Sequence, residues 1–337
     1  MTNPYEASQD ATPPAVEPLA FGQTSHSDQD VRRSKLRIWP LFPLTIAELL
    51  LASLLQVVVI VFILLFGREA GSTIKEAAMT LPTRMYEAPI FISLLACSGM
   101  SMIIGGFLFG RISAKNQRCL LSDRLGLQWP TMPILSWMTL LLGSIPVLLV
   151  AVGAVILVEK VIPGDETVLE LYRNISTPWA IVFIIAIGVL PGFGEELFFR
   201  GFLQRRFLQR LRPTAAIGIT SVIFGLAHVT PHGIVLATII GVWLGIIAYR
   251  TNSIWPGAFI HAFINSGWNV YQVGRFQWGF PTIPPLWFSV IGGVITLAAF
   301  LYAAKIIASR RIPDASSGID IQQWPRLMPH DAASSVG

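Results

Sequence analysis

The amino-acid sequence predicts an all-α integral membrane protein, folded as a polytopic bundle of about eight transmembrane helices. Three observations support this fold class. Of 337 residues, 53% are hydrophobic and only 13% are charged, whereas soluble domains contain about 25% charged residues. The mean hydropathy is +0.62. Apolar stretches long enough to cross a hydrocarbon core of ~30 Å recur along the chain.

The expected spans follow one another with polar connections between them. The first three and the last are predominantly apolar over ~20 residues, the length that a transmembrane helix needs. The middle four are shorter and are interrupted by Pro and Gly. The eight expected spans are about 44–66, 89–110, 134–158, 179–199, 214–230, 233–250, 254–272 and 287–308.

Polar segments flank the expected spans. Residues 1–37, rich in Ser, Asp, Pro and Gln, are expected to form a disordered cytoplasmic tail, and residues 310–337 a second, flexible cytoplasmic tail. Residues 38–309 are expected to form one transmembrane domain, with the chemically informative segment at about 179–272. No clear cleavage site follows the first apolar stretch, so we interpret it as a retained helix.

The basic residues lie in alternate connections. They precede the first span and follow the second, fourth, sixth and eighth, whereas the other connections are poor in net positive charge: 67–88 is balanced and 159–173 is net acidic. This alternation predicts that both termini are cytoplasmic, in a plasma membrane that we expect to be bacterial. The net charge of +5 therefore reflects membrane topology, and the expected partners include the lipid bilayer but no nucleic acid.

Two adjacent acids, Glu195 and Glu196, lie within one of the most apolar parts of the chain. Ionisable groups inside a membrane segment cost ~2.5–3.5 kcal/mol each on insertion scales, so they indicate a functional site by default. Glu196 and Arg200 are four residues apart and share a helix face. Arg200 can therefore hold Glu196 ionised and leave Glu195 free for water or substrate. A partly solvated helix end is the alternative interpretation.

Two further segments carry polar residues at helical spacing. His228 follows Phe224 by four residues, and a lone histidine in an apolar helix is more often a packing residue than a catalyst. His261 and Asn265 are also four residues apart. Such a pair can direct two donors at one oxygen, as an oxyanion hole requires, or it can join neighbouring membrane helices.

Together these residues resemble the CPBP family, which includes CAAX-type prenyl-protein proteases and bacteriocin-processing or immunity proteins. The family pattern is Glu-Glu-x-x-x-Arg, then Phe-x-x-x-His, then His-x-x-x-Asn, and all three parts occur in order within less than a third of the chain. The resemblance implies an intramembrane endopeptidase that hydrolyses a peptide bond in a membrane-associated protein or peptide.

The resemblance also implies roles for individual residues. Glu195 would activate water with help from His228, while His261 and Asn265 would stabilise the oxyanion. The supporting residues would be Glu196, Arg200 and Phe224.

A metal site is the main mechanistic alternative. Zinc commonly takes three protein ligands and a water, and His228, His261 and Glu195 would be its ligands here. Because these three candidate ligands are scattered over three expected helices, with no compact pair among them to seed the site, we favour a metal-independent glutamate mechanism.

Two other functions stay open from the sequence. One is a non-catalytic scaffold or immunity factor of the same fold, and the other is a small proton-coupled permease that uses the intramembrane acids and histidines as a relay. Cleavage of a membrane substrate distinguishes the protease from both, and substrate-dependent proton flux identifies the permease.

Overall fold

The computed structural model describes residues 39–67, 71–112, 120–164, 168–282 and 285–310, and all regular structure within them is helical. The predicted all-α polytopic bundle is confirmed. The expected tails lie outside the described residues except for Arg310, so the proposed domain limits stay a prediction.

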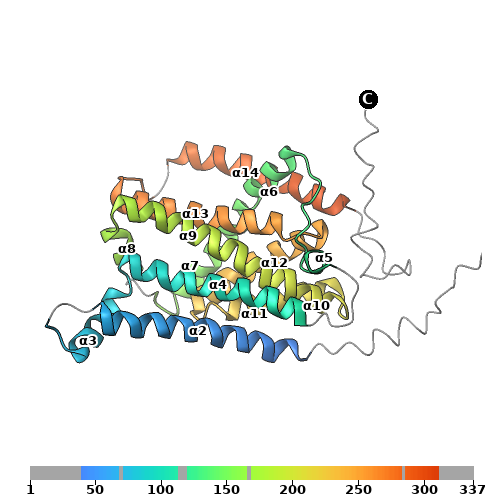
Figure 1. Cartoon of the computed structure of the whole chain (residues 1–337). Helices are drawn as coiled ribbons and strands as arrows, with labels where there is room; N and C mark the ends of the chain where they lie inside the picture. The colour runs from blue at the N-terminus through green and yellow to red at the C-terminus, as the bar shows by residue number, and fades with distance from the viewer. Residues whose placement is uncertain (1–38, 68–70, 113–119, 165–167, 283–284, 311–337) are drawn as a thin grey trace, which may run out of the picture. The chain divides into compact units, whose positions relative to one another are not determined.

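The helices follow one another along the chain as labelled in Figure 1. They are α2 (Leu41–Phe66), α3 (Ile74–Arg84), α4 (Ala88–Ile112), α5 (Leu121–Arg124), α6 (Ile134–Gly143), α7 (Ile145–Glu159), α8 (Val168–Asn174), α9 (Thr177–Glu195), the π-helix η1 (Glu196–Gln204), α10 (Arg205–Leu208), α11 (Pro213–Leu226), α12 (Pro231–Thr251), α13 (Trp255–Gln277) and α14 (Leu286–Ser309).

Six helical stretches among the described residues are long and apolar enough to cross a membrane, which is the pattern of an integral multi-pass protein. They are α2, α4, α6 with α7, α9 with η1 and α10, α12, and most of α14. Each of the eight expected spans corresponds to a helix, but α11 has only 14 residues, or ~21 Å. The helix α13 has sufficient length but falls outside the apolar set. The count of eight therefore stays a prediction.

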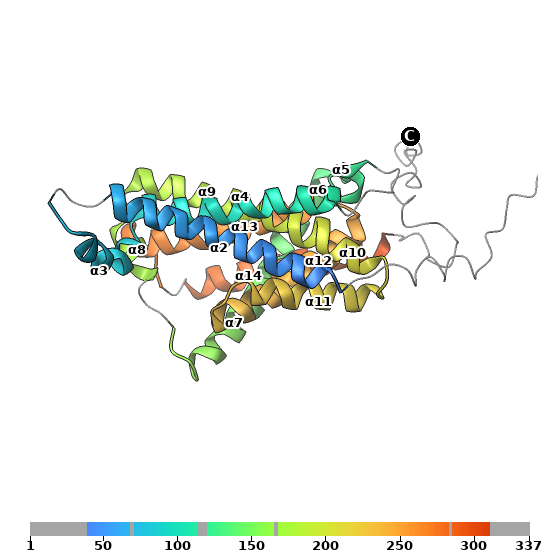
Figure 2. The same ribbon diagram turned by 60° about the horizontal axis from the view of Figure 1, so that its bottom comes forward.

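The helix α9 lies at the centre of the site-bearing part of the bundle. Both views place α4 between α2 and α9, and α13 packs against α9 (Figures 1 and 2). Small residues allow this close packing: a Cβ on Gly194 would lie 2.6 Å from the carbonyl oxygen of Gly99 in α4. A Cβ on Gly192 would lie 3.1 Å from the Ala258 carbonyl oxygen in α13.

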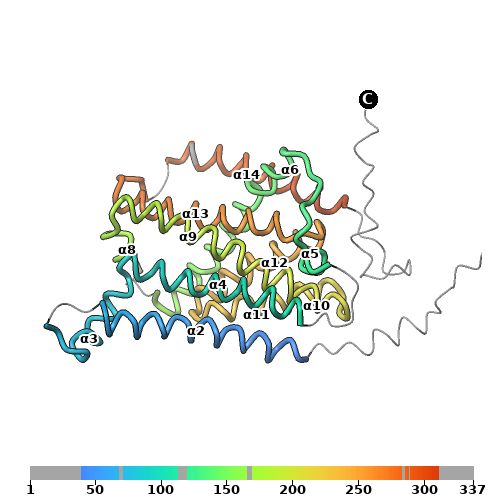
Figure 3. The backbone as a smooth tube through the Cα atoms, in the orientation of Figure 1, coloured from blue at the N-terminus to red at the C-terminus, as the bar shows by residue number. Residues whose placement is uncertain are grey.

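The chain continues from α9 through η1 into α10 as one long stretch, Thr177–Leu208 (Figure 3). The sequence predicted that Pro and Gly interrupt this span, but the helix continues through Pro191 and its neighbouring glycines. Because the helix ends at Leu208 rather than near residue 199, Glu195 lies ~20 Å from its end. His228, just beyond the end of α11, is ~22 Å from Pro213, so the two residues reach similar depths.

Side-chain hydrogen bonds fasten the chain at both ends of the bundle. Arg205 donates hydrogen bonds to the carbonyl and Oδ1 of Asn252, and Arg310 donates to the carbonyl of Thr131. These contacts involve α10, the end of α14, and the connections at Thr131 and Asn252, at the end of the bundle that we call the basic end. At the opposite end, Gln277 donates to the carbonyl of Tyr172.

Candidate active site

A buried ion pair forms the centre of the candidate site. Arg200 Nη1 lies 2.7 Å from Glu196 Oε1, and both side chains are fully buried. The pairing expected from their four-residue spacing is therefore confirmed. His261 from α13 adds a third group, because its Nδ1 lies 3.2 Å from the same carboxylate oxygen. Glu196 is thus held from two sides.

The neighbouring Glu195 has a different environment. Its side chain is 19% exposed, and its Oε2 lies 3.8 Å from Nε2 of His261. That oxygen has no hydrogen-bond partner among the described residues. The ring of His261 therefore contacts two carboxylates, one bound by Arg200 and one with an oxygen that has no hydrogen-bond partner in the described part of the chain.

The hydrogen bonds fix the proton on His261 Nδ1. Glu196 Oε1 already accepts from Arg200, and an ionised carboxylate can only accept hydrogen bonds. The imidazole must then donate from Nδ1 to Glu196, which leaves Nε2 facing Glu195. His261 can donate from Nε2 only when the ring is doubly protonated.

Phe224 holds several site residues in place. The Arg200 guanidinium lies over its ring, 4.2 Å from the centroid, which is a cation–π distance. The rings of His228 and His261 meet Phe224 at right angles, with centroids 4.9 and 6.0 Å away. The aromatic ring thus contacts both imidazoles and covers the cation.

His228 lies in the turn between α11 and α12. Its Nδ1 is 2.9 Å from the Phe224 carbonyl oxygen, so Nδ1 carries the proton and Nε2 of the neutral ring keeps its lone pair. No hydrogen bond joins it to either glutamate, both of which are described. The next residue, Val229, has a φ of 62°, a conformation that a β-branched residue rarely adopts. Such backbone strain clusters at functional sites.

Asn265 makes a contact between helices. Its Nδ2 donates to the carbonyl of Ile187 in α9 at 3.2 Å, which is the joining role considered from the sequence. The amide has two N–H donors, and this bond uses one of them. Ser266 donates to the carbonyl of Ile184, so adjacent residues fix α13 against α9.

The sequence reasoning missed the local structure that presents these groups. Residues 196–204 form a π-helix, a rare form that is frequent at functional sites. Glycines make room for the buried charges: a Cβ on Gly257 would lie 2.8 Å from Glu196 Oε2. The Glu195–Glu196 pair inside an apolar stretch was the only sequence signal near the π-helix.

The ligand set considered for zinc is not assembled. Among the described residues, no three or more His, Cys, Asp or Glu side chains come together in a group that could hold a metal ion. No ion pair or hydrogen bond joins the described His228 to His261 or to Glu195, and Glu196 is engaged by Arg200. We therefore derive no chemical step through a metal.

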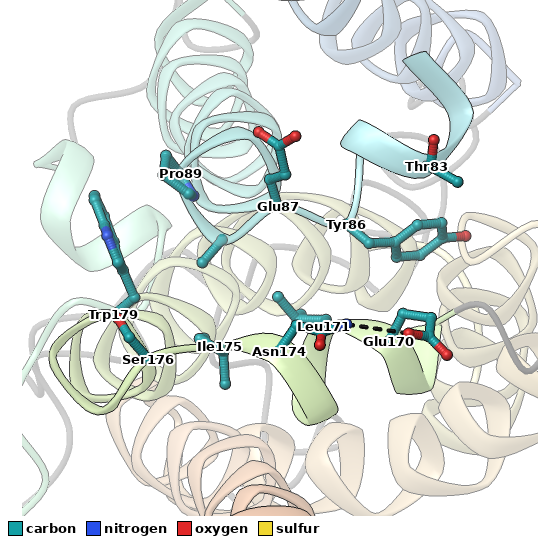
Figure 4. A pocket seen from close by; sticks show the side chains of 11 residues that line it. Thr83, Tyr86, Glu87, Pro89, Glu170, Leu171, Asn174, Ile175, Ser176 and Trp179 are labelled. Atoms are coloured by element: carbon teal, nitrogen blue, oxygen red, sulfur yellow. Dashed lines mark hydrogen bonds between the residues drawn. The ribbon is translucent and has the colours of Figure 1, made fainter. Parts of the chain in front are cut away.

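A cavity of about 370 Å³ lies at the other end of α9. Figure 4 shows its lining side chains, among them Tyr86, Glu87 and Trp179, and the hydrogen bond from Asn174 to Glu170. None of the site residues expected from the sequence lines it.

Burial next to this cavity raises the pKa of Tyr172 to about 12, so its hydroxyl stays protonated. Tyr172 donates a hydrogen bond to Asn269 Oδ1 at 2.6 Å.

Comparison with known proteins gives one match. Residues 177–267 match the family model described as type II CAAX prenyl endopeptidase Rce1-like. The matched range contains all seven motif residues that the sequence indicated, from Glu195 to Asn265. The resemblance that we stated from the three motifs is therefore confirmed over this range. No curated protein and no solved structure matches the chain. The match supports an intramembrane endopeptidase in general.

Proposed function

We propose that the chain hydrolyses a peptide bond in a membrane-associated protein or peptide, with Glu195 as the general base. The observation that carries this proposal is the difference between the two adjacent glutamates. Glu196 is fully buried and bound by Arg200 and His261, whereas Glu195 is partly exposed and has an unpartnered oxygen. Carboxylates in contrasting environments are the usual source of a separate catalytic base.

The proposed reaction begins with a water held at Glu195. The carboxylate takes one proton from this water while the water oxygen attacks the carbonyl carbon of the scissile bond. The C–N bond then breaks, and the proton held by Glu195 passes to the departing nitrogen. General-base catalysis of this kind contributes ~10²–10⁴-fold. His228 assists the activation of this water through Nε2. That nitrogen keeps its lone pair because Nδ1 carries the proton that is donated to the Phe224 carbonyl.

The oxyanion is stabilised by donors on α13. Asn265 offers the N–H that its bond to Ile187 does not use, and His261 offers Nε2–H in its doubly protonated form. Two carboxylates beside that ring balance its charge. One oxyanion donor is typically worth ~10²–10³-fold in rate.

The test is cleavage of membrane-inserted peptides by purified protein in liposomes, followed by mass spectrometry. We expect Glu195→Gln, His228→Ala and His261→Ala each to abolish cleavage while leaving the protein folded. Asn265→Ala should lower the rate by ~10²–10³-fold. Glu159→Gln, an exposed acid at the end of α7, is the matched control and should be unaffected.

Two results would count against the proposal. Near-normal turnover by Glu195→Gln would reject Glu195 as the base. If the unaltered protein cleaves nothing but conducts protons in a substrate-dependent way, the permease is the better description. Peptides retained by Glu195→Gln during purification identify the substrate class.

A further inference from the structure

A file of buried polar side chains leads away from the candidate site. Glu196, Arg200 and Gln204 are four residues apart along η1, and each is at most 1% exposed. Arg200 donates to the carbonyl of Gly241 and Gln204 to that of Gly245, both in α12. The file therefore runs along the η1–α12 contact toward the basic end.

Each member of the file keeps one buried polar atom without a protein partner. These atoms are Glu196 Oε2, Arg200 Nε and Gln204 Oε1. Buried polar atoms nearly always have a partner, either in the protein or in ordered water. The three atoms comprise two acceptors and one donor, and water can both donate and accept.

Glycines provide the space along this file. A Cβ on Gly245 would lie 2.8 Å from Gln204 Oε1, and one on Gly241 would lie 3.3 Å from Arg200 Nη2. A Cβ on Gly257 would lie 2.8 Å from Glu196 Oε2. Any larger residue at these positions would press on the polar side chains, so the file can be accommodated between the helices only where the facing residues are glycines.

A small cavity lies at the outer part of the file. Its volume is about 10 Å³, and its lining includes Arg200, Gln204, Arg205 and Asn252. This volume is the lower limit for one water molecule, ~10–15 Å³, and the polar lining supplies the partners that such a water needs. Arg205, which is partly exposed, connects the cavity with the basic end through Asn252.

We propose that the file Glu196–Arg200–Gln204 is a hydrated route by which water reaches the buried Glu196, and through it the neighbouring Glu195, from the basic end. Water molecules bridge the three unpartnered atoms, and the route ends at Glu196, which shares His261 with Glu195. Its use as a supply of hydrolytic water rests on the proposed function. The presence of water along the file does not depend on catalysis, so it can be tested separately.

The experiment measures the reaction of single cysteines with a small, charged methanethiosulfonate in a Cys97→Ser, Cys119→Ser background. Only a thiolate reacts, and a dry apolar site suppresses its formation, so we expect Gln204→Cys to react at least about tenfold faster than Leu203→Cys. Leu203 is the matched control because it is adjacent and equally buried. Ala248→Cys, which lines the cavity, repeats the test with a smaller change, against Ile247→Cys.

A second arm closes the route. Adding Gly245→Ala, whose Cβ meets Gln204 Oε1, should slow the labelling of Gly241→Cys, which lies beyond Gly245 from the basic end, by about tenfold. Gly153→Ala in α7, with no atoms near its Cβ, should not change the rate. Equal labelling of the Gln204 and Leu203 variants, and of the Ala248 and Ile247 variants, would overturn the proposal. Fast labelling in a protein without peptidase activity would retain the route and reject the proposed function instead.

Discussion

At the scale of single residues, two neighbouring glutamates have different environments because they lie on different sides of one helix. The spacing of Glu196 and Arg200 was sufficient to predict their ion pair, since residues four apart share a face. The contact of both glutamates with His261 was not predictable from spacing. It depends on which helix packs against α9, and helical periodicity within α13 does not contain that information.

The role of Asn265 could be narrowed but not assigned from the sequence. A pair of donors at helical spacing fits either an oxyanion hole or a helix contact, and the structure places one amide donor on the Ile187 carbonyl. The pattern indicates donors on one face, and only the packed bundle shows which acceptors they meet.

Arg200 is expected to be essential for the stability of the site. Arg200→Ala leaves the Glu196 carboxylate buried without its cation, and breaking a buried ion pair in this way typically costs ~3–5 kcal/mol. We expect a lower unfolding temperature in detergent and loss of activity. Arg200→Lys should restore part of the stability, because it keeps the charge but loses the planar fork that reaches both Glu196 and Gly241. Unchanged melting of Arg200→Ala would show that the pair does not matter.

Metal removal provides a second test at this scale. The zinc ligands considered from the sequence do not form a group among the described residues. We therefore expect the purified, active protein to keep its turnover after treatment with a strong chelator. Elemental analysis of the same sample should give far less than one zinc per chain. Stoichiometric zinc, whose removal abolishes activity and whose return restores it, would refute the metal-independent mechanism.

At the scale of elements, the π-helix η1 and the glycines around it present the charged groups. The sequence interpretation treated Gly192 and Gly194 as possible helix breakers, because glycine disfavours helix interiors. In the structure both remain helical and permit close contacts with α13 and α4. Tertiary packing outweighs propensity here, and the sequence alone does not show which neighbour a glycine will meet.

Gly257 tests the importance of this fit. A Cβ at this position lies 2.8 Å from Glu196 Oε2, and overpacking of a core typically costs ~1–3 kcal/mol. We expect Gly257→Ala to lower both the unfolding temperature in detergent and the rate of peptide cleavage. Gly267→Ala is the matched control, because it lies in the same helix with open space around its Cβ. Equal behaviour of the two variants would show that Glu196 is not tightly enclosed.

At the scale of the whole molecule, composition predicted the membrane bundle, because a chain so poor in charge cannot cover a soluble surface. The number of crossings was less predictable. The helix α11 is too short to cross by itself, and α13 carries the polar residues of the site and of its contacts with α9. Helices that build an intramembrane site deviate from the apolar pattern by which spans are recognised, so the site-bearing helices are the hardest to count.

The orientation of the bundle is the last prediction. Hydrogen bonds join Arg205 with Asn252 and Arg310 with Thr131 at one end, so connections that are basic in the sequence meet in space. Positively charged connections favour the cytoplasm, and we expect both termini there. Reporter fusions after residues 75, 120, 165 and 208 should report outside, inside, outside and inside in turn. Because Arg205 also lies at the outer part of the buried polar file, this orientation would place the proposed water route on the cytoplasmic side. Two successive fusions on the same side would contradict the orientation, whatever the outcome of the cleavage assays.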